Sequence, residues 1–160
     1  MAFYQQSGVL FFGSRLRRLS ESFLADINNI YRHHGIHFDA AWFPIFYMLS
    51  EKDAMSIRDI SDELEVSHSA ASQLITKLDE KGLIRSTADK VDGRKKLVTF
   101  TPKGQKLLQQ VLPIWKAVQL AMDEMLQQNP QTRELMGAIS NTENALKQLS
   151  LFERIEKHIQ

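Results

Sequence analysis

The chain has 160 residues, of which 43% are hydrophobic and 24% are charged, and it has no cysteine. This length and composition favour one globular domain over a disordered chain. The lack of cysteine excludes a disulfide framework, a thiolate metal site and a thiol nucleophile. No apolar run reaches the roughly 18 residues that a transmembrane helix needs, and no signal peptide pattern is present. We therefore expect a cytoplasmic protein that has no membrane partner.

Apolar spacing predicts two helices in the first third of the chain. Apolar residues recur at steps of three and four from about residue 8 to residue 34, which predicts a helix that ends at Gly35. The next helix begins after Asp39, a suitable N-cap, and has Pro44 in its first turn. Because residues 42–49 are apolar at nearly every position, we expect this second helix to be buried.

A helix–turn–helix and a β-hairpin are predicted next. Two helical stretches, 56–64 and 67–81, are separated by two residues, and Ser56 and Ser67 are suited to cap them. Gly82 is suited to end the second. Residues 83–87 are β-prone, and residues 96–101 alternate between polar and apolar, so a hairpin should form with Asp92-Gly93 in its turn.

The last third of the chain predicts two more helices. One begins at Thr101-Pro102, and the other begins at Asn129-Pro130 and runs to residue 159, with interruptions near Gly137 and Ser150. The expected fold class is mainly α with a small β-wing. In a single domain of residues 1–160, a winged helix–turn–helix at 39–101 would lie between helices at 8–38 and 102–160. These outer helices have wider apolar faces than one small head can cover, which favours dimerisation; a bundle packed within one chain is the alternative.

The formal net charge of +1 hides an uneven distribution. Residues 49–65 have two positive and six negative side chains, whereas residues 81–106 have eight positive and two negative ones. The predicted hairpin and its flanks are therefore strongly basic. A basic hairpin directly after a helix–turn–helix is typical of a DNA-binding surface, and an ordinary solvated turn is the alternative.

Polar residues of the 67–81 helix lie off its apolar stripe, as expected for a helix that enters the major groove. Serine and threonine can reach phosphates or base edges, glutamine can pair with adenine, and lysine can reach phosphate or guanine. The alternative is an ordinary exposed helix face. The predicted DNA-binding residues of this helix are Ser67, His68, Ser69, Ser72, Gln73, Thr76 and Lys77.

The stretch from Ile57 to Arg85 resembles the reading head of the MarR (multiple antibiotic resistance regulator) family. The wing strengthens the resemblance, because residues 92–104, DGRKKLVTFTPKG, match the family pattern D-x-R-x-x-x-V-x-L-T-x-x-G, with Phe100 at the usual leucine. The family consists of homodimeric winged helix–turn–helix transcription factors, mostly repressors. The resemblance implies that the 67–81 helix enters the major groove and that two such helices read a pseudo-palindromic operator in double-stranded DNA. The order of elements extends the resemblance over most of the chain, more weakly at both ends.

The resemblance also assigns roles within the wing. Arg94 would enter or border the minor groove, where narrow A·T-rich stretches attract arginine. Asp92 would order the wing and Gly93 would permit its turn. The further basic residues expected to contact DNA are Lys90, Lys95 and Lys96.

The sequence departs from the family pattern at three places in the helix–turn–helix. Ala70-Ala71 replace a frequent threonine–valine pair, Gln73 replaces a frequent arginine, and Glu65 replaces a frequent glycine in the turn. We expect these changes to weaken phosphate anchoring or to shift base preference towards adenine at Gln73, without changing the fold.

Family members often bind small aromatic molecules where the dimer helices meet the reading head. Aromatic walls and one cation could form such a pocket for an anionic effector, although a buried aromatic cluster of this kind is also typical of a hydrophobic core. The predicted lining is Phe12, Arg15, Trp42, Phe43, Phe46 and Tyr47. His33, His34 and His37 have no carboxylate at ligand spacing, so we expect neither a metal site nor a cofactor.

The favoured function is a sequence-specific, ligand-responsive transcriptional regulator without enzymatic activity. The sequence has none of the hydrolase, P-loop or zinc-protease motifs. Two alternatives remain: a winged helix that binds another protein without reading DNA, and a small helical enzyme that uses the histidines. The basic wing favours DNA over a protein partner.

Overall fold

The computed structural model describes residues 8–88 and 96–159, which form two compact units, residues 1–115 and residues 116–160. The first unit contains the 3-10 helix η1 (Gly8–Phe11) and the long helix α2 (Phe12–His33). Gly35 has φ +66°, and the N–H of Ile36 donates to the carbonyl of Tyr31 at 2.9 Å. The predicted glycine stop is therefore present.

The second predicted helix is divided into η2 (Ala40–Trp42) and α3 (Phe43–Lys52). As expected, an oxygen of the Asp39 side chain accepts a hydrogen bond from the N–H of Ala41, at 2.9 Å. Only one face of α3 is buried, although the sequence led us to expect burial nearly all round. Phe46 is fully buried, whereas Phe43 and Tyr47 are exposed.

The helix–turn–helix consists of α4 (Ile57–Glu63) and α5 (His68–Glu80), and both predicted caps are present. The Ser56 hydroxyl accepts from the N–H of Asp59 at 3.1 Å, and the Ser67 hydroxyl accepts from that of Ala70 at 3.2 Å. The helices pack through their apolar faces and leave the polar face of α5 outside. The buried residues on these two faces include Ile60, Ala71, Ile75 and Leu78.

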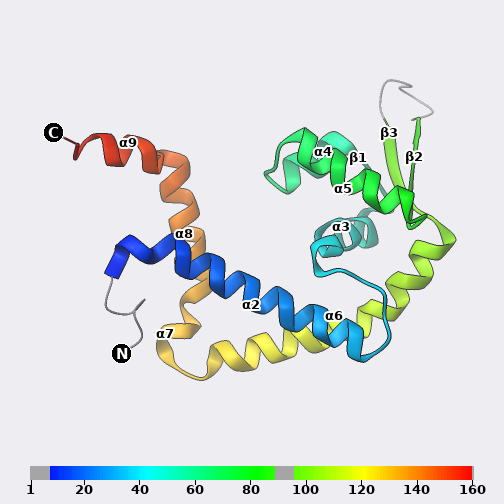
Figure 1. Ribbon diagram of the computed structural model, residues 1–160, viewed down its shortest axis with the longest axis horizontal. Helices are drawn as coiled ribbons and strands as arrows, with labels where there is room; N and C mark the ends of the chain where they lie inside the picture. The colour runs from blue at the N-terminus through cyan, green and yellow to red at the C-terminus, as the bar shows by residue number, and fades with distance from the viewer. Residues whose placement is uncertain (1–7, 89–95, 160) are drawn as a thin grey trace. The chain divides into compact units, whose positions relative to one another are not determined.

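A three-stranded antiparallel sheet lies beside the helix–turn–helix (Figure 1). The predicted hairpin forms strands β2 (Ile84–Ala88) and β3 (Lys96–Phe100), in a register that places Ile84 opposite Phe100 and Ala88 opposite Lys96. A third strand, β1 (Ala54–Ser56), pairs with the other edge of β3 and was not predicted from the sequence. The β1 strand leads directly into α4 and so fixes the helix–turn–helix against the wing.

The helix α6 (Pro102–Gln127) begins as predicted. It follows the sheet in the chain, and its start contacts the end of α5. The Thr101 hydroxyl accepts from the N–H of Gly104 at 3.1 Å and donates to the carbonyl of Gly82 at 2.6 Å. One side chain thus caps α6 and holds its first turn against the end of α5. The close approach also requires the glycine, because a Cβ at Gly104 would lie 1.9 Å from the carbonyl oxygen of Leu83.

The second unit contains the rest of α6 and the helices α7 (Pro130–Arg133), α8 (Leu135–Gln148) and α9 (Leu151–Glu156). Asn129 caps α7, and its side-chain oxygen accepts from the N–H of Thr132 at 3.0 Å. The predicted break at Ser150 is confirmed, since Ser150 caps α9. The break predicted near Gly137 instead falls at Glu134, and Gly137 lies inside α8. The expected mainly helical fold with a small β-wing is confirmed.

Candidate nucleic-acid interface

The outward face of α5 is polar from its cap to its last turns. Among the predicted residues, His68, Ser69, Gln73 and Lys77 are exposed, and Ser72 is partly buried. The opposite face packs against the core through Ala71, Ile75 and Leu78. Because three- and four-residue spacing separates the two faces, the burial of one presents the other to solvent.

Two of the predicted side chains have structural roles within the helix–turn–helix. Ser67 caps α5, so its hydroxyl oxygen already accepts a backbone hydrogen bond. The Thr76 hydroxyl donates to the carbonyl of Ser72 at 2.9 Å. Both retain capacity to accept a further hydrogen bond or to donate one after a rotation, but His68, Ser69, Gln73 and Lys77 make up most of the exposed polar surface.

A hollow of about 680 Å³ joins the start of α5 to α4 and to the wing. His68 and Ser72 come from α5, Lys96 is the first residue of β3, and residues 56–59 come from the start of α4. The structure therefore brings together three of the residues predicted to bind DNA, from two elements. We refer to this place as the α4–α5–β3 hollow.

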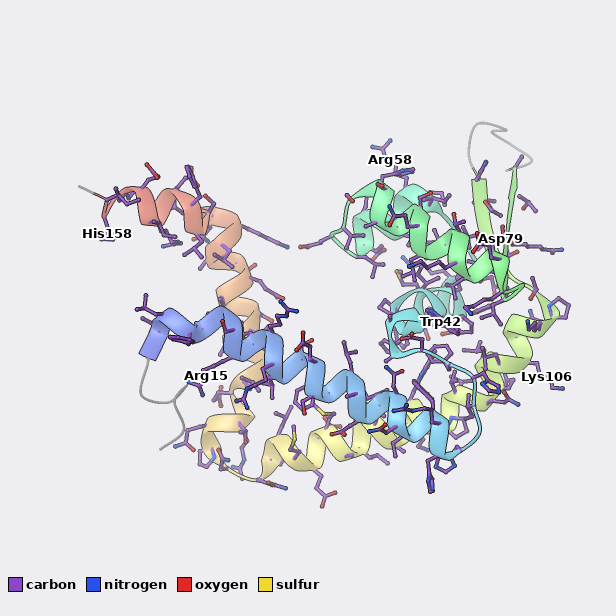
Figure 2. The ribbon with its side chains drawn as sticks, in the orientation of Figure 1. Arg15, Trp42, Arg58, Asp79, Lys106 and His158 are labelled. Carbon is purple, nitrogen blue, oxygen red and sulfur yellow. The ribbon has the colours of Figure 1, made fainter. Side chains whose placement is uncertain are left out.

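Arg58 also lines the α4–α5–β3 hollow, and it is not among the DNA-binding residues predicted from the sequence. Its side chain is 85% exposed and extends from the outer face of α4 (Figure 2). A carboxylate oxygen of Asp62 lies 3.8 Å from its Nε, so the guanidinium can still reach an anion on the surface. Arg58 lies in the acidic stretch of residues 49–65, so the summed charge of that stretch concealed it. Its position in the first turn of the first helix was the signal that could have found it.

Several acidic residues of that stretch are engaged within the head. Asp59 completes a capping box with Ser56, whose hydroxyl donates to the carboxylate at 2.7 Å. Glu63 accepts from the ammonium of Lys52 at 2.6 Å. These carboxylates hold the start of α4 and join its end to Lys52 of α3, so an acidic segment can adjoin the predicted DNA-binding surface.

Most of the predicted wing lies outside the described residues. Lys96 is exposed at the first position of β3, opposite Ala88. Lys90, Asp92, Gly93, Arg94 and Lys95 fall in the stretch 89–95 that the structure does not describe. Their DNA-binding and wing-ordering roles stay predictions.

The residues predicted to line a ligand pocket are divided among several places in the structure. Phe12 and Arg15 line a hollow at the start of α2 with neighbours from α2 and from η1. Trp42 lines a separate hollow beside α6. Phe46 is fully buried in the core, where its ring centroid is 4.9 Å from that of Phe100. The effector pocket stays a prediction, and Phe46 would have to act from inside the core.

The histidine group lies at the end of α2 and in the loop that follows. The rings of His33 and His34 contact each other edge to face, with centroids 5.3 Å apart. Within residues 8–88 and 96–159, no group of three or more His, Asp or Glu side chains is placed to hold a metal ion. In the same residues, no helix has both the length and the apolar character to cross a bilayer.

Comparison with known proteins relates this geometry to one family. Residues 34–95 match the sequence model of the MarR family. The fold is similar to that of the S. aureus MepR–DNA complex, with a TM-score of 0.68, 21% identity, and coverage of 86% of this chain and 97% of the other. The chain resembles the MarR family in sequence and in fold.

Two further solved structures extend the similarity. Bordetella bronchiseptica BpsR, whose DNA binding is regulated by 6-hydroxynicotinic acid, aligns with a TM-score of 0.64 and 24% identity, over 82% of this chain and 91% of its own. The transcriptional regulator BldR from Sulfolobus solfataricus aligns with a TM-score of 0.62 and 22% identity, over 91% and 99%. A search of curated proteins found no match. At these identities, the solved structures establish a MarR-type winged-helix fold for the chain.

Proposed function

We propose that the chain is a sequence-specific, DNA-binding transcriptional regulator, most simply a repressor. The observation that carries the proposal is the exposed polar face of α5, held by a capped helix–turn–helix beside a strand that begins with Lys96. A helix presented in this way fits the major groove with its N-terminal residues at the base edges. The MarR-family match over the same residues supports this assignment.

Within this proposal, the residues divide between base reading and anchoring. Gln73 is exposed near the middle of α5, and its amide can pair with adenine through two hydrogen bonds. Arg58 and Lys96 both line the α4–α5–β3 hollow together with the N-terminal part of α5, and there they would anchor phosphates. Arg94 would add a minor-groove contact, as the family resemblance implies.

We further propose that the protein binds DNA as a homodimer. Phe12, Leu16, Leu19 and Ile30 recur at helical spacing on one stripe of α2, and each is 42–53% exposed. Large side chains exposed along one face usually mark an interface. A two-fold axis would place the two α5 helices about 34 Å apart, one turn of DNA, and so match a pseudo-palindrome.

Regulation by a small effector is part of the proposal. In the similar protein BpsR, DNA binding is regulated by 6-hydroxynicotinic acid, a small aromatic molecule. An effector acts by binding one spacing of the two reading heads more tightly than another, which changes the affinity for the operator. The protein itself needs no catalytic group for this function.

The direct test selects bound sequences from a random DNA pool and then measures affinity for the best site by fluorescence anisotropy. We expect selection of a two-fold repeated sequence and an affinity that falls steeply with salt. Arg58→Ala with Lys96→Ala should weaken binding and reduce the salt dependence, whereas Lys116→Ala with Lys157→Ala should change neither. Recovery of no preferred sequence, with equal weak binding to every DNA, would favour the protein-binding alternative.

A further inference from the structure

A second hollow lies at the opposite end of α5 from the α4–α5–β3 hollow. It has a volume of about 290 Å³ and lies between η2, the C-cap of α5, the residue before β2 and the first turns of α6. Figure 2 labels Trp42 on one side of this region and Lys106 on the other. We refer to it as the lysine hollow. Its lining residues are His37, Trp42, Lys81, Leu83, Lys103, Lys106, Leu107 and Gln110.

The lysine hollow is lined by positively charged residues and by no negatively charged ones. Three lysines line it, and no acidic residue does. Among the described residues, none of Lys81, Lys103 and Lys106 forms an ion pair within 4.0 Å. Cations of like sign gathered in one concave place repel each other and raise the local potential, so a bound anion would stabilise them.

Two of the three lysines are held in place by neighbouring groups. The Nζ atom of Lys103 donates to the backbone carbonyl of Lys81 at 2.6 Å, and the Nζ atom of Lys81 lies 5.3 Å from the centroid of the Trp42 ring. The backbone beneath them is fixed by Gly104, which allows α6 to touch Leu83. Because these side chains are already held in place, less conformational entropy is lost when their ammonium groups gather around a ligand.

Besides the lysines, the hollow is lined by the apolar side chains of Trp42, Leu83 and Leu107 and by the polar ones of His37 and Gln110. Leu83 and Leu107 are buried, and Trp42 is partly buried beside them. The volume of about 290 Å³ is near the lower end of the roughly 300–1,000 Å³ typical of small-molecule sites. A volume of this size suits a compact anion.

We propose that the lysine hollow binds a small anion with more than one negative charge, of the phosphate-ester or pyrophosphate class. Three ammonium groups can each donate charge-assisted hydrogen bonds to phosphoryl oxygens, while Trp42 provides an apolar wall. The hollow lies at the C-terminal end of α5, one helical turn beyond Lys77 and about 20 Å, at 1.5 Å per residue, from the N-terminal end that lines the α4–α5–β3 hollow. The proposal is independent of sequence-specific DNA binding by the chain.

The test measures binding of inorganic pyrophosphate to the full-length protein by isothermal titration calorimetry, with chloride and benzoate at matched ionic strength. We expect pyrophosphate to bind more tightly than either. Lys81→Gln with Lys106→Gln should raise the Kd at least about tenfold, since each lost ion–hydrogen bond is of that size. The double variant Lys116→Gln with Lys157→Gln, which changes the net charge equally, should leave the Kd within about twofold. Lys103 is retained in the test because its hydrogen bond also caps α5, and thermal unfolding of each variant checks that it folds.

Two results would overturn the proposal. An equal loss of pyrophosphate affinity in both double variants would show attraction by net charge alone. A wild-type protein that binds pyrophosphate no more tightly than benzoate would exclude a site for multiply charged anions. A third measurement separates the two sources of phosphate: if Lys81→Gln with Lys106→Gln weakens DNA binding and lowers its salt slope without changing the pyrophosphate Kd, the lysines contact the DNA backbone and the small-anion site is wrong.

Discussion

Gly104 and Leu83 are in backbone contact at the junction of α5, the wing and α6. A Cβ at position 104 would lie 1.9 Å from the carbonyl oxygen of Leu83 and 2.9 Å from its carbonyl carbon. No side-chain rotation can relieve a clash between a Cβ and backbone. The last glycine of the wing pattern is therefore a packing requirement of the fold.

Replacement of Gly104 by alanine should destabilise the protein by about 3 kcal/mol, because α6 must shift away from Leu83. The matched control is Gly137→Ala in α8, where a Cβ meets no atom within 4 Å. This change should stabilise by about 0.5–1 kcal/mol, since alanine is the better helix former. Urea unfolding of both variants measures the difference, and equal stabilities would show that the close approach is not maintained in solution.

The hydrogen bond from Trp115 Nε1 to Tyr31 Oη, 2.9 Å long, predicts a pH dependence at the alkaline end. Burial raises the pKa of Tyr31 above its ordinary value, and the bond from Trp115 partly opposes the rise. Because the folded state disfavours the phenolate, its stability is complete below the unfolded pKa of about 10 and falls as the pH rises through that value towards the folded pKa.

Tyr31→Phe should remove this part of the alkaline loss and cost about 1 kcal/mol at neutral pH, because the indole N–H loses its acceptor. The measurement is urea unfolding at pH 7 and between pH 9 and pH 11. Tyr47→Phe is the control, since Tyr47 is 49% exposed. If both variants retained the alkaline loss of the wild type, Tyr31 would not be its source.

Glu65, in the turn between α4 and α5, has φ +52°. This left-handed conformation costs L-residues roughly 1–2 kcal/mol and costs glycine almost nothing. The family frequently has glycine at this position. In this chain the backbone adopts the left-handed conformation although the residue is a glutamate. Glu65→Gly should therefore be more stable than Glu65→Ala by about 1 kcal/mol. Both variants remove the same carboxylate, so their difference in thermal unfolding isolates the backbone; equal stabilities would mean that the turn relaxes out of the left-handed region.

The sequence was sufficient to predict those parts of the fold that depend on local chemistry. The caps Ser56, Ser67 and Asn129 are each formed by a short polar side chain and the backbone that follows it. The β1 strand could not be predicted from the sequence, because it has three residues and exists only through its pairing with β3. Local pattern cannot show such a long-range partner.

The same distinction applies to the candidate sites. Periodicity correctly placed His68 and Gln73 on the exposed face of α5. It could not show that Arg58, in an acidic segment, joins His68 and Lys96 around one hollow. Nor could composition separate Phe46, which is fully buried, from its exposed neighbour Tyr47. Contacts between distant segments decide these cases.

Dimerisation through α2 can be tested by replacing the apolar residues that are exposed along one face of this helix. Leu16 and Leu19 share one helical face with Phe12, whereas Leu24 is turned about 120° from Phe12 at 100° per residue and is 42% exposed. Leu16→Gln with Leu19→Gln should weaken the dimer at least about tenfold, because two large apolar side chains lose their burial. Leu24→Gln should have a much smaller effect. Sedimentation velocity over a concentration series measures both, and a wild-type monomer at micromolar concentration would contradict the two-fold arrangement.

Base reading by Gln73 gives the last prediction. If its amide pairs with adenine, Gln73→Ala should cost about 1–3 kcal/mol on the selected operator and little on an operator whose matching A·T pair is changed to G·C. A phosphate contact would instead cause the same small loss on every sequence and a lower salt slope. Gln109→Ala, an exposed glutamine on α6, is the control. Affinities of the wild type and Gln73→Ala for the two operators form a double-mutant cycle, and a coupling energy near zero would remove Gln73 from the base-reading set.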